Sequence, residues 1–283
     1  MKNNNWIILS VLFLVIFDIF IWGQIVFGGS NENLEVYFLD VGQGDSELIV
    51  LPGNVKILID GGPNNKILKE LSSVLKPTDR YIDLVILSHP ELDHFSGLTD
   101  VLKRYQVGAF VSNGRRGNAP AFRDLEKIIK ENKIAAVVLA ENDKIKYLKN
   151  SFNVLSPSKN LLQSAELNDT TLVMKFENEE VKILFTGDIG ENIEEFLIKK
   201  YDLSADVLKV AHHGSKFSTG ENFLKKATPK ISVIEVGKNS YGHPTAETLN
   251  GLASIGAQIF RTDLDGAIKL VINGANINFW KKK

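Results

Sequence analysis

The sequence contains no cysteine among its 283 residues. This absence excludes disulfide bonds, thiolate metal sites and cysteine nucleophiles. The sequence also lacks an excess of charge of one sign, because 33 Lys and Arg residues stand against 34 Asp and Glu residues. A chain without net positive charge has no overall field that attracts nucleic acid or anionic lipid, so any polyanion-binding site must be local.

Only one long hydrophobic run is present. Trp6–Phe27 has Asp18 as its single charged residue, and at about 1.5 Å per residue a helix of this length crosses the hydrocarbon core of a membrane. Lys2 precedes the run while Glu32 and Glu35 follow it, so the positive-inside rule predicts a cytoplasmic amino terminus. We therefore expect a single-pass membrane protein whose catalytic domain lies on the extracytoplasmic side.

Two features of this run leave alternatives open. Asp18 is costly inside a bilayer unless it is protonated or contacts another helix. The run also fits a cleaved signal peptide with an apolar region at Ile7–Phe17 and a cleavage site at Val26–Gly28, which would give a secreted protein.

The rest of the chain predicts one mixed α/β domain. We divide the sequence into an anchor and flexible linker at residues 1–33, with Gly28–Asn33 as the linker, and a domain at residues 34–283. Early strands resemble hairpins and later strands alternate with helices, which favours mixed sheets covered by helices over a doubly wound parallel sheet. Glu177–Glu180 is expected as a hairpin turn, and Lys281–Lys283 as a frayed tail.

The expected elements follow from hydrophobic periodicity and from turn and cap residues. The strands are Glu35–Leu39, Glu47–Leu51, Lys56–Ile59, Leu84–Leu87, Ala109–Val111, Leu172–Phe176, Lys182–Phe185, Val207–Val210, Ile231–Val236, Gln258–Arg261 and Ala267–Val271. The helices are Lys66–Leu75, Phe95–Tyr105, Arg123–Glu131, Ile193–Lys200, Asn222–Ala227 and Ala246–Ser254.

All five histidines fall in three short segments, each just after an expected strand. In the first segment, His89 and Glu91 are two residues apart in extended backbone and can point to the same side. Asp93 and His94 begin the following helix and can face a second ion. Any one of these residues alone would read as a helix cap or a surface side chain, but together they indicate a metal site.

Three later segments add further candidate ligands. Asp188 ends a strand after Gly187 and is suited to bridge two ions, although a Gly-Asp pair alone is ordinary turn chemistry. His212 and His213 precede Gly and Ser, a pattern that indicates binding of a reacting group. His243 would complete a metal shell.

These motifs, in this order, resemble the metallo-β-lactamase superfamily, and within it the hydrolase domain of the ComEC competence family. The motifs are H-x-x-x-D-H from His89, T-G-D ending at Asp188, H-H-G-S from His212 and G-H-P around His243. Leu39–Ser46, Ile59–Gly62 and Asn168–Val173 support the narrower likeness.

The resemblance implies a four-layer αββα sandwich with two divalent ions, zinc or manganese, at the edge of the sheets. It assigns His89 and Glu91 to one ion, Asp93, His94 and His243 to the other, and Asp188 to the position between them. Two departures concern the first ion: Glu91 stands where the superfamily usually has histidine, and Asn168–Thr170 occupies the place of an upstream histidine. A shell richer in carboxylate favours harder ions such as manganese or magnesium beside zinc.

The resemblance also implies the chemistry. Two ions about 3.5 to 4 Å apart activate a water and stabilise the oxygens of a displacement at phosphorus. Asp93 would orient the nucleophile, and His213, with His212 and Lys209, would neutralise phosphoryl charge or protonate the leaving group.

The expected function is an exported, membrane-anchored phosphodiesterase with DNA as the suggested substrate. Because no second run of about 18 apolar residues follows the first, any DNA channel would be a separate protein. Two alternatives remain: hydrolysis of a small ester, lactone or wall-linked phosphoester, and a non-catalytic metal-binding module. The sequence gives no indication of the oligomeric state.

Overall fold

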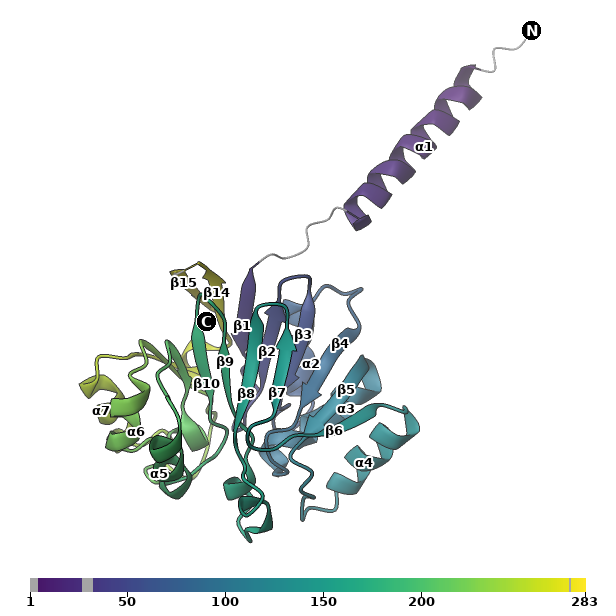
Figure 1. The fold of residues 1–283 in the computed structure, drawn as a ribbon. Coiled ribbons are helices and arrows are strands. Elements are labelled where there is room, and N and C mark those ends of the chain that lie inside the picture. The colour runs from purple at the N-terminus through teal and green to yellow at the C-terminus, as the bar shows by residue number, and fades with distance from the viewer. Residues whose placement is uncertain (1–4, 27–32, 275) are drawn as a thin grey trace.

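The chain folds into two β-sheets that pack face to face, with helices on both outer faces (Figure 1). The computed structural model describes residues 5–26, 33–274 and 276–283. One sheet has eight strands in the order β15-β14-β1-β2-β3-β4-β5-β6, and the other has seven in the order β13-β12-β11-β10-β9-β8-β7. This arrangement confirms the predicted four-layer αββα sandwich.

The strands of the larger sheet are β1 (Leu34–Phe38), β2 (Glu47–Leu51), β3 (Val55–Ile59), β4 (Tyr81–Ile86), β5 (Gln106–Ser112), β6 (Ala135–Val138), β14 (Ile268–Asn273) and β15 (Asn276–Lys281). Those of the smaller sheet are β7 (Lys144–Tyr147), β8 (Asn150–Ser156), β9 (Val173–Glu177), β10 (Lys182–Phe185), β11 (Val207–Lys209), β12 (Ile231–Ile234) and β13 (Gln258–Arg261). The α-helices are α1 (Asn5–Val26), α2 (Lys66–Val74), α3 (Leu92–Arg104), α4 (Phe122–Glu131), α5 (Glu191–Lys200), α6 (Glu221–Ala227), α7 (Ala246–Ser254) and α8 (Thr262–Asp265).

Three layers of apolar side chains hold the sandwich together. The middle layer lies between the sheets and includes the rings of Phe38, Phe152, Phe176 and Phe185, all buried. A second layer joins the larger sheet to α2, α3 and α4, and a third joins the smaller sheet to α5, α6 and α7. Full burial of one phenylalanine side chain of the middle layer stabilises the fold by roughly 1.5 to 3 kcal/mol.

The parallel strands of both sheets have their carboxyl ends at the same edge of the sandwich. In the larger sheet β3, β4, β5 and β6 run parallel, and β1 has the same direction because β2 is antiparallel to both β1 and β3. In the smaller sheet β10, β11, β12 and β13 run parallel. The loops that follow these strands therefore gather at the carboxyl edge, where ligands bind in open α/β sheets.

The sequence interpretation missed four strands and misjudged the C-terminus. The missed strands are β6, β7, β8 and β15. Three of them, β6, β7 and β15, are short or exposed and rich in Ala, Lys or Asn, and β8 contains two Asn residues, which are rare in strands. The expected frayed tail is wrong: β15 continues to Lys281, and the backbone amides of Lys282 and Lys283 donate to the carbonyls of Ala267 and Asp265. The hairpin turn between β9 and β10 is confirmed.

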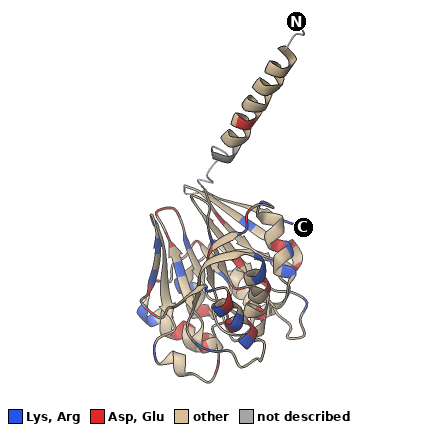
Figure 2. Cartoon of the chain, turned by 90° about the vertical axis from the view of Figure 1, so that its right-hand side faces the viewer, with Lys and Arg blue, Asp and Glu red and all other residues tan. Residues whose placement is uncertain are grey.

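The helix α1 is long and apolar enough to cross a membrane. Its described side chains are exposed, and Figure 2 shows it uncharged except for one acidic residue, Asp18. In the same view, basic and acidic residues are interspersed over the rest of the chain. The amino-terminal Lys2 and most of the expected linker, residues 28–32, lie outside the described residues.

Candidate functional site

Four side chains from the two sheets converge at the carboxyl edge: Asp93, His94, Asp188 and His213. Asp93 and His94 belong to the first turn of α3, whereas Asp188 follows β10 and His213 follows β11. One potential ligand atom from each of the four lies within 4.8 Å of the others. The structure therefore brings together residues separated by more than a hundred positions in the sequence.

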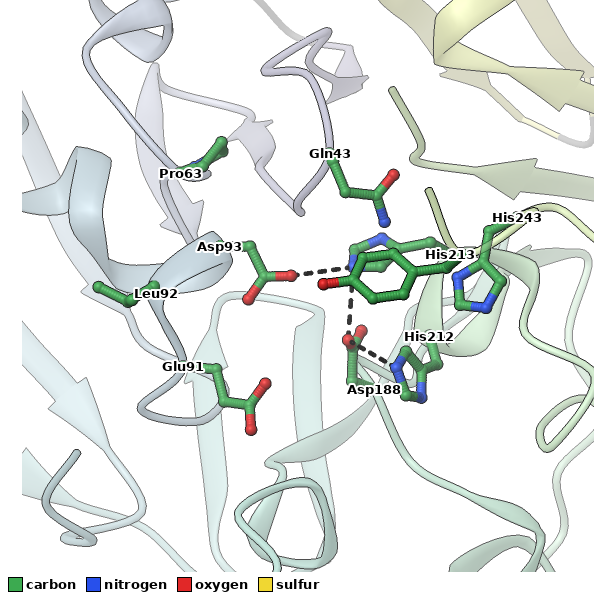
Figure 3. Close-up of a pocket in the computed structure, with 10 residues that line it drawn as sticks. Gln43, Pro63, Glu91, Leu92, Asp93, Asp188, His212, His213 and His243 are labelled. Atoms are coloured by element: carbon green, nitrogen blue, oxygen red, sulfur yellow. Dashed lines mark ion pairs between the residues drawn. The ribbon is translucent and has the colours of Figure 1, made fainter. Parts of the chain in front are cut away.

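The distances around Asp188 define the centre of this cluster (Figure 3). Its Oδ2 lies 3.4 Å from Nε2 of His94 and 3.4 Å from Nε2 of His213. The Nε2 atom of His213 is also 3.4 Å from Oδ2 of Asp93. Two carboxylates and two imidazoles thus face one small volume.

Local backbone geometry places these groups. Gly187 has φ of +51°, and a Cβ there would lie 2.5 Å from Cγ2 of Thr171, so only glycine lets the chain turn toward Asp188. His212 and His213 also occupy the left-handed region, with φ of 49° and 55°. Each such residue costs about 1 to 3 kcal/mol, and strain of this kind clusters at functional sites.

His89 and Glu91 are the other two candidate ligands of the first sequence motif. His89 is fully buried, and its ring centroid is 4.1 Å from that of His94. Its Nδ1 lies 3.0 Å from Oγ of Ser88, which leaves Nε2 without a partner among the described residues. Glu91 lines the open cavity described below.

The donor set fits a divalent cation. Nε2 of His89, His94 and His213 and Oδ1 of Asp188 are buried and have no hydrogen-bond partner in the described part of the chain. Unpaired buried polar atoms are costly unless something else satisfies them. Imidazole nitrogens and carboxylate oxygens together suit zinc or manganese.

An outer set of hydrogen-bonding groups orients His94 and His213 through the Nδ1 atom of each side chain. Nδ1 of His94 is 2.8 Å from Oδ2 of Asp60, and Nδ1 of His213 donates to the carbonyl oxygen of Glu235 at 2.8 Å. Oδ1 of Asp45 lies 3.3 Å from the same nitrogen of His213. Contacts of this kind fix the ring orientation that a metal ligand needs.

The sequence interpretation gave Asp45, Asp60 and Glu235 no role. Asp60 directly follows β3, just as Asp188 follows β10, so the rule that selected Asp188 could have selected Asp60 as well. Asp45 lies in an irregular loop, and its partners are far away in the sequence. Only the folded chain reveals that role.

Lys209 lies behind the cluster and does not reach the cavity surface. The side chain is fully buried, and Nζ pairs with Asp45 and donates to the carbonyl oxygen of Gly187 at 3.0 Å. Its distance to Oδ1 of Asp188 is 3.7 Å. The buried Nζ of Lys209 therefore faces Asp45, Gly187 and Asp188 and not the cavity.

His212 and His243 lie together at the opening of the site. A cavity of about 390 Å³ is lined by Gln43, Pro63, Glu91, Leu92, Asp93, Asp188, His212, His213, Tyr241 and His243. The ring centroids of His212 and His243 are 5.7 Å apart. Nε2 of His212 is 3.9 Å from Asp188, whereas His243 lies outside the group of four.

The charges of the cluster shift its pKa values in opposite directions. Burial lowers the pKa of His94, but the negative charges of Asp188 and Asp93 outweigh burial and hold this pKa well above its usual value. Burial raises the pKa of Asp188, but His213 and His94 outweigh it and keep this pKa well below its usual value. Burial, followed by the charge of His94, lowers the pKa of His89 to about 3, so His89 is a neutral imidazole.

Comparisons with known proteins agree with this fold. A model of the metallo-beta-lactamase superfamily matches residues 39–237. The chain is 30% identical to "ComE operon protein 3" of Bacillus subtilis (strain 168), over 85% of this chain and 33% of that protein. It is 27% identical to "Competence protein ComA" of Neisseria gonorrhoeae, over 86% of this chain and 34% of that protein.

The chain belongs to the metallo-β-lactamase superfamily and is related to competence proteins. It spans about a third of the length of the curated relatives it matches. Among solved structures it is similar to the metallo-beta-lactamase fold protein YhfI of Bacillus subtilis, with a TM-score of 0.56 and 11% identity over 81% of this chain and 97% of that one. The hydrolase fold predicted from the sequence is confirmed.

Proposed function

We propose that this chain is a metal-dependent phosphodiesterase that cleaves DNA outside the cell membrane. The observation that carries the proposal is the convergence of Asp93, His94, Asp188 and His213. His94, Asp188 and His213 have buried polar atoms without a partner among the described residues, and Asp93, Asp188 and His213 line an open cavity. The relatives named as competence proteins support a substrate of this kind, because competence is the uptake of DNA. We assign residues 1–33 to the anchor and linker and residues 34–283 to the hydrolase domain.

We propose that the site holds two divalent ions. Asp93, His94 and His213 would hold one, His89 and Glu91 the other, with Asp188 between them and His243 available at the opening. When bound, such ions activate a water and stabilise charge during displacement at phosphorus. The geometry adds His213 to the ligands that the sequence suggested, because its Nε2 points at two carboxylates.

The chain's own residues account for substrate orientation and proton movement. The Asp93 side chain is partly exposed in the cavity, and its carboxylate can accept a proton there. His212 is also partly exposed and can donate a hydrogen bond to a phosphoryl oxygen or a proton to the leaving group. Lys209 stabilises Asp45 and Asp188 from behind and contacts no substrate.

A small ester or lactone is the second candidate substrate. The described cavity lining contains no Lys or Arg residue, so the side chains of this cavity supply no positive charge for a polyanion. The DNA proposal therefore requires bound cations to neutralise phosphate at this cavity.

One set of experiments tests the proposal. The full chain, purified in detergent, is incubated with single-stranded DNA, duplex DNA, bis-p-nitrophenyl phosphate and a lactone, with manganese or zinc added. We expect cleavage of the phosphodiesters and about two bound ions per chain. Hydrolysis of the lactone alone would favour the second candidate, and bound metal without any turnover would indicate a binding module.

We predict that Asp188→Asn lowers phosphodiesterase activity by more than about 100-fold, because even the outer groups that orient metal ligands contribute 10- to 100-fold. Metal content measured on the same sample should also fall. Asp124→Asn is the matched control, because Asp124 is exposed on α4. Full activity in Asp188→Asn would contradict the bridging role.

A further inference from the structure

An exposed aromatic side chain stands at the opening of the site. Tyr241 is one of the residues that line the cavity, yet 74% of its surface is exposed. Its ring centroid lies 5.7 Å from that of His243, with 32° between the ring planes. In the described part of the chain its hydroxyl makes no hydrogen bond, so the fold does not use this group.

The loop that carries Tyr241 is held in place by one side chain. Oδ1 of Asn239 accepts hydrogen bonds from the backbone amides of Tyr241 and His243. Nδ2 of Asn239 donates to the carbonyl oxygens of Gly237 and His243. The ring is therefore presented to solvent by a fixed backbone, which lowers the entropy cost of a stacking contact.

Apolar groups also form the opposite wall. Pro63 and Leu92 line the cavity on the far side of Asp93 and Asp188 from His243 (Figure 3). Leu92 is 51% exposed at the start of α3. The cavity thus combines candidate ligand groups with the apolar side chains of Pro63 and Leu92.

A further exposed ring and an unpaired cation lie close by in the chain. Phe217, four residues after His213, is 69% exposed, and Nζ of Lys216 is 4.9 Å from the centroid of its ring. Lys216 forms no ion pair with any described residue. Lys216 lines a different cavity from Tyr241, so the subsite proposed below depends on Tyr241 alone.

We propose that Tyr241 is a specificity-determining residue whose ring stacks on an unpaired nucleobase next to the scissile phosphate. The occupant is therefore a single-stranded, base-bearing phosphodiester. This inference rests on the proposed phosphodiesterase activity and names its substrate class. A base in a duplex is already stacked on both faces and has no free face for Tyr241.

Two oligomers and three variants test this subsite. The probes are a labelled six-nucleotide oligothymidylate and an oligomer of the same length with abasic spacers in place of every base. Binding to the full chain in detergent is measured by fluorescence anisotropy with calcium, and cleavage is measured with manganese. The variants are Tyr241→Ala, Tyr241→Phe and, as a control, Tyr81→Ala, since Tyr81 is exposed at the opposite end of the larger sheet.

We expect Tyr241→Ala to weaken binding of oligothymidylate by about 5- to 150-fold, the range for loss of one stacked base. Binding of the abasic oligomer should not change. In cleavage the effect should appear in KM, with kcat close to the wild-type value. Tyr241→Phe keeps the ring and should behave as wild type, as should Tyr81→Ala.

The results separate this inference from the proposed function. Equal affinity for the two oligomers in the wild type, or equal effects of Tyr241→Ala on both, would overturn the stacking subsite even if DNA is cleaved. A base preference that disappears in Tyr241→Ala, without any cleavage by the wild type, would support the subsite and refute the phosphodiesterase proposal.

Discussion

Glu194 is a buried carboxyl group that holds the loop following the paired histidines. Its two oxygens accept hydrogen bonds from the backbone amides of Thr219 and Gly220, at 2.5 and 2.9 Å. Burial raises the pKa of Glu194 to about 7, although these hydrogen bonds oppose the shift. The folded chain therefore keeps this proton at pH values where the unfolded chain has lost it.

This shift predicts a pH dependence of stability. Between about pH 4.5 and 7 the unfolded state releases the proton of Glu194 first, so stability falls as pH rises through this window, by about 3 kcal/mol. In Glu194→Gln that contribution is absent. We expect the stability of Glu194→Gln relative to wild type to increase from pH 4.5 to pH 7.5, measured by denaturant unfolding.

Glu195→Gln provides the control, because Glu195 is the exposed neighbour on α5. Its stability should follow the wild type at each pH. Parallel curves for Glu194→Gln and wild type would show that Glu194 has an ordinary pKa.

At the scale of single residues, the candidate metal ligands were easier to predict from the sequence than the buried side chains that orient them. His89, His94 and Asp188 could be proposed as metal ligands because the chain has only five histidines and because these residues lie within a few positions of a strand end. The role of Asp45 could not be predicted in this way, because its partner Lys209 is 164 positions away in the sequence. Long-range pairing of this kind depends on how two sheets meet, which periodicity does not record.

At the scale of elements, the pair of Asp45 and Lys209 joins the two sheets. Asp45 lies between β1 and β2 of the larger sheet, and Lys209 is the last residue of β11 in the smaller one. Both side chains are buried. The backbone amide of Ser46, which donates to Oε1 of Glu235 at 3.0 Å, links the sheets at the same edge.

We predict that Lys209→Met destabilises the protein by about 3 to 5 kcal/mol, because it leaves the charge of Asp45 buried without a partner. The double variant Asp45→Asn/Lys209→Met removes both charges and should recover much of this loss. Denaturant unfolding of the single and double variants measures the coupling.

Lys230→Met supplies a comparison, because Lys230 forms an exposed pair with Asp206. Its cost should stay below about 1 kcal/mol. Strictly additive effects of Asp45→Asn and Lys209→Met would mean that the two charges do not support each other.

The elements predicted well were those with a strong amphipathic or buried pattern. The bounds of β2, β10, β13 and α7 match the prediction. The strands that were missed depend on neighbours for their pairing: β6 extends the larger sheet beside β5, and β15 pairs only with β14. Tertiary context overrides weak local preference at such edges.

At the scale of the whole molecule, the absence of cysteine makes the proposed topology simple to test. A single cysteine introduced as Lys127→Cys, exposed on α4, should react with a membrane-impermeant maleimide on intact spheroplasts. Asn3→Cys should react only after lysis, because the positive-inside rule places the amino terminus in the cytoplasm. Labelling of Asn3→Cys alone in intact spheroplasts would reverse the topology, and a cleaved signal peptide would remove that residue altogether.

The direction of β1 determines which way the cavity faces. The chain enters β1 at Leu34, whereas the loops of the metal cluster follow the other end of this strand and its parallel neighbours. Five extended residues span about 15 Å, and the stretch between Val26 and Leu34 adds at most about 30 Å. In the proposed topology we therefore expect the cavity to open on the side of the domain that faces away from the lipid, within about 45 Å of it.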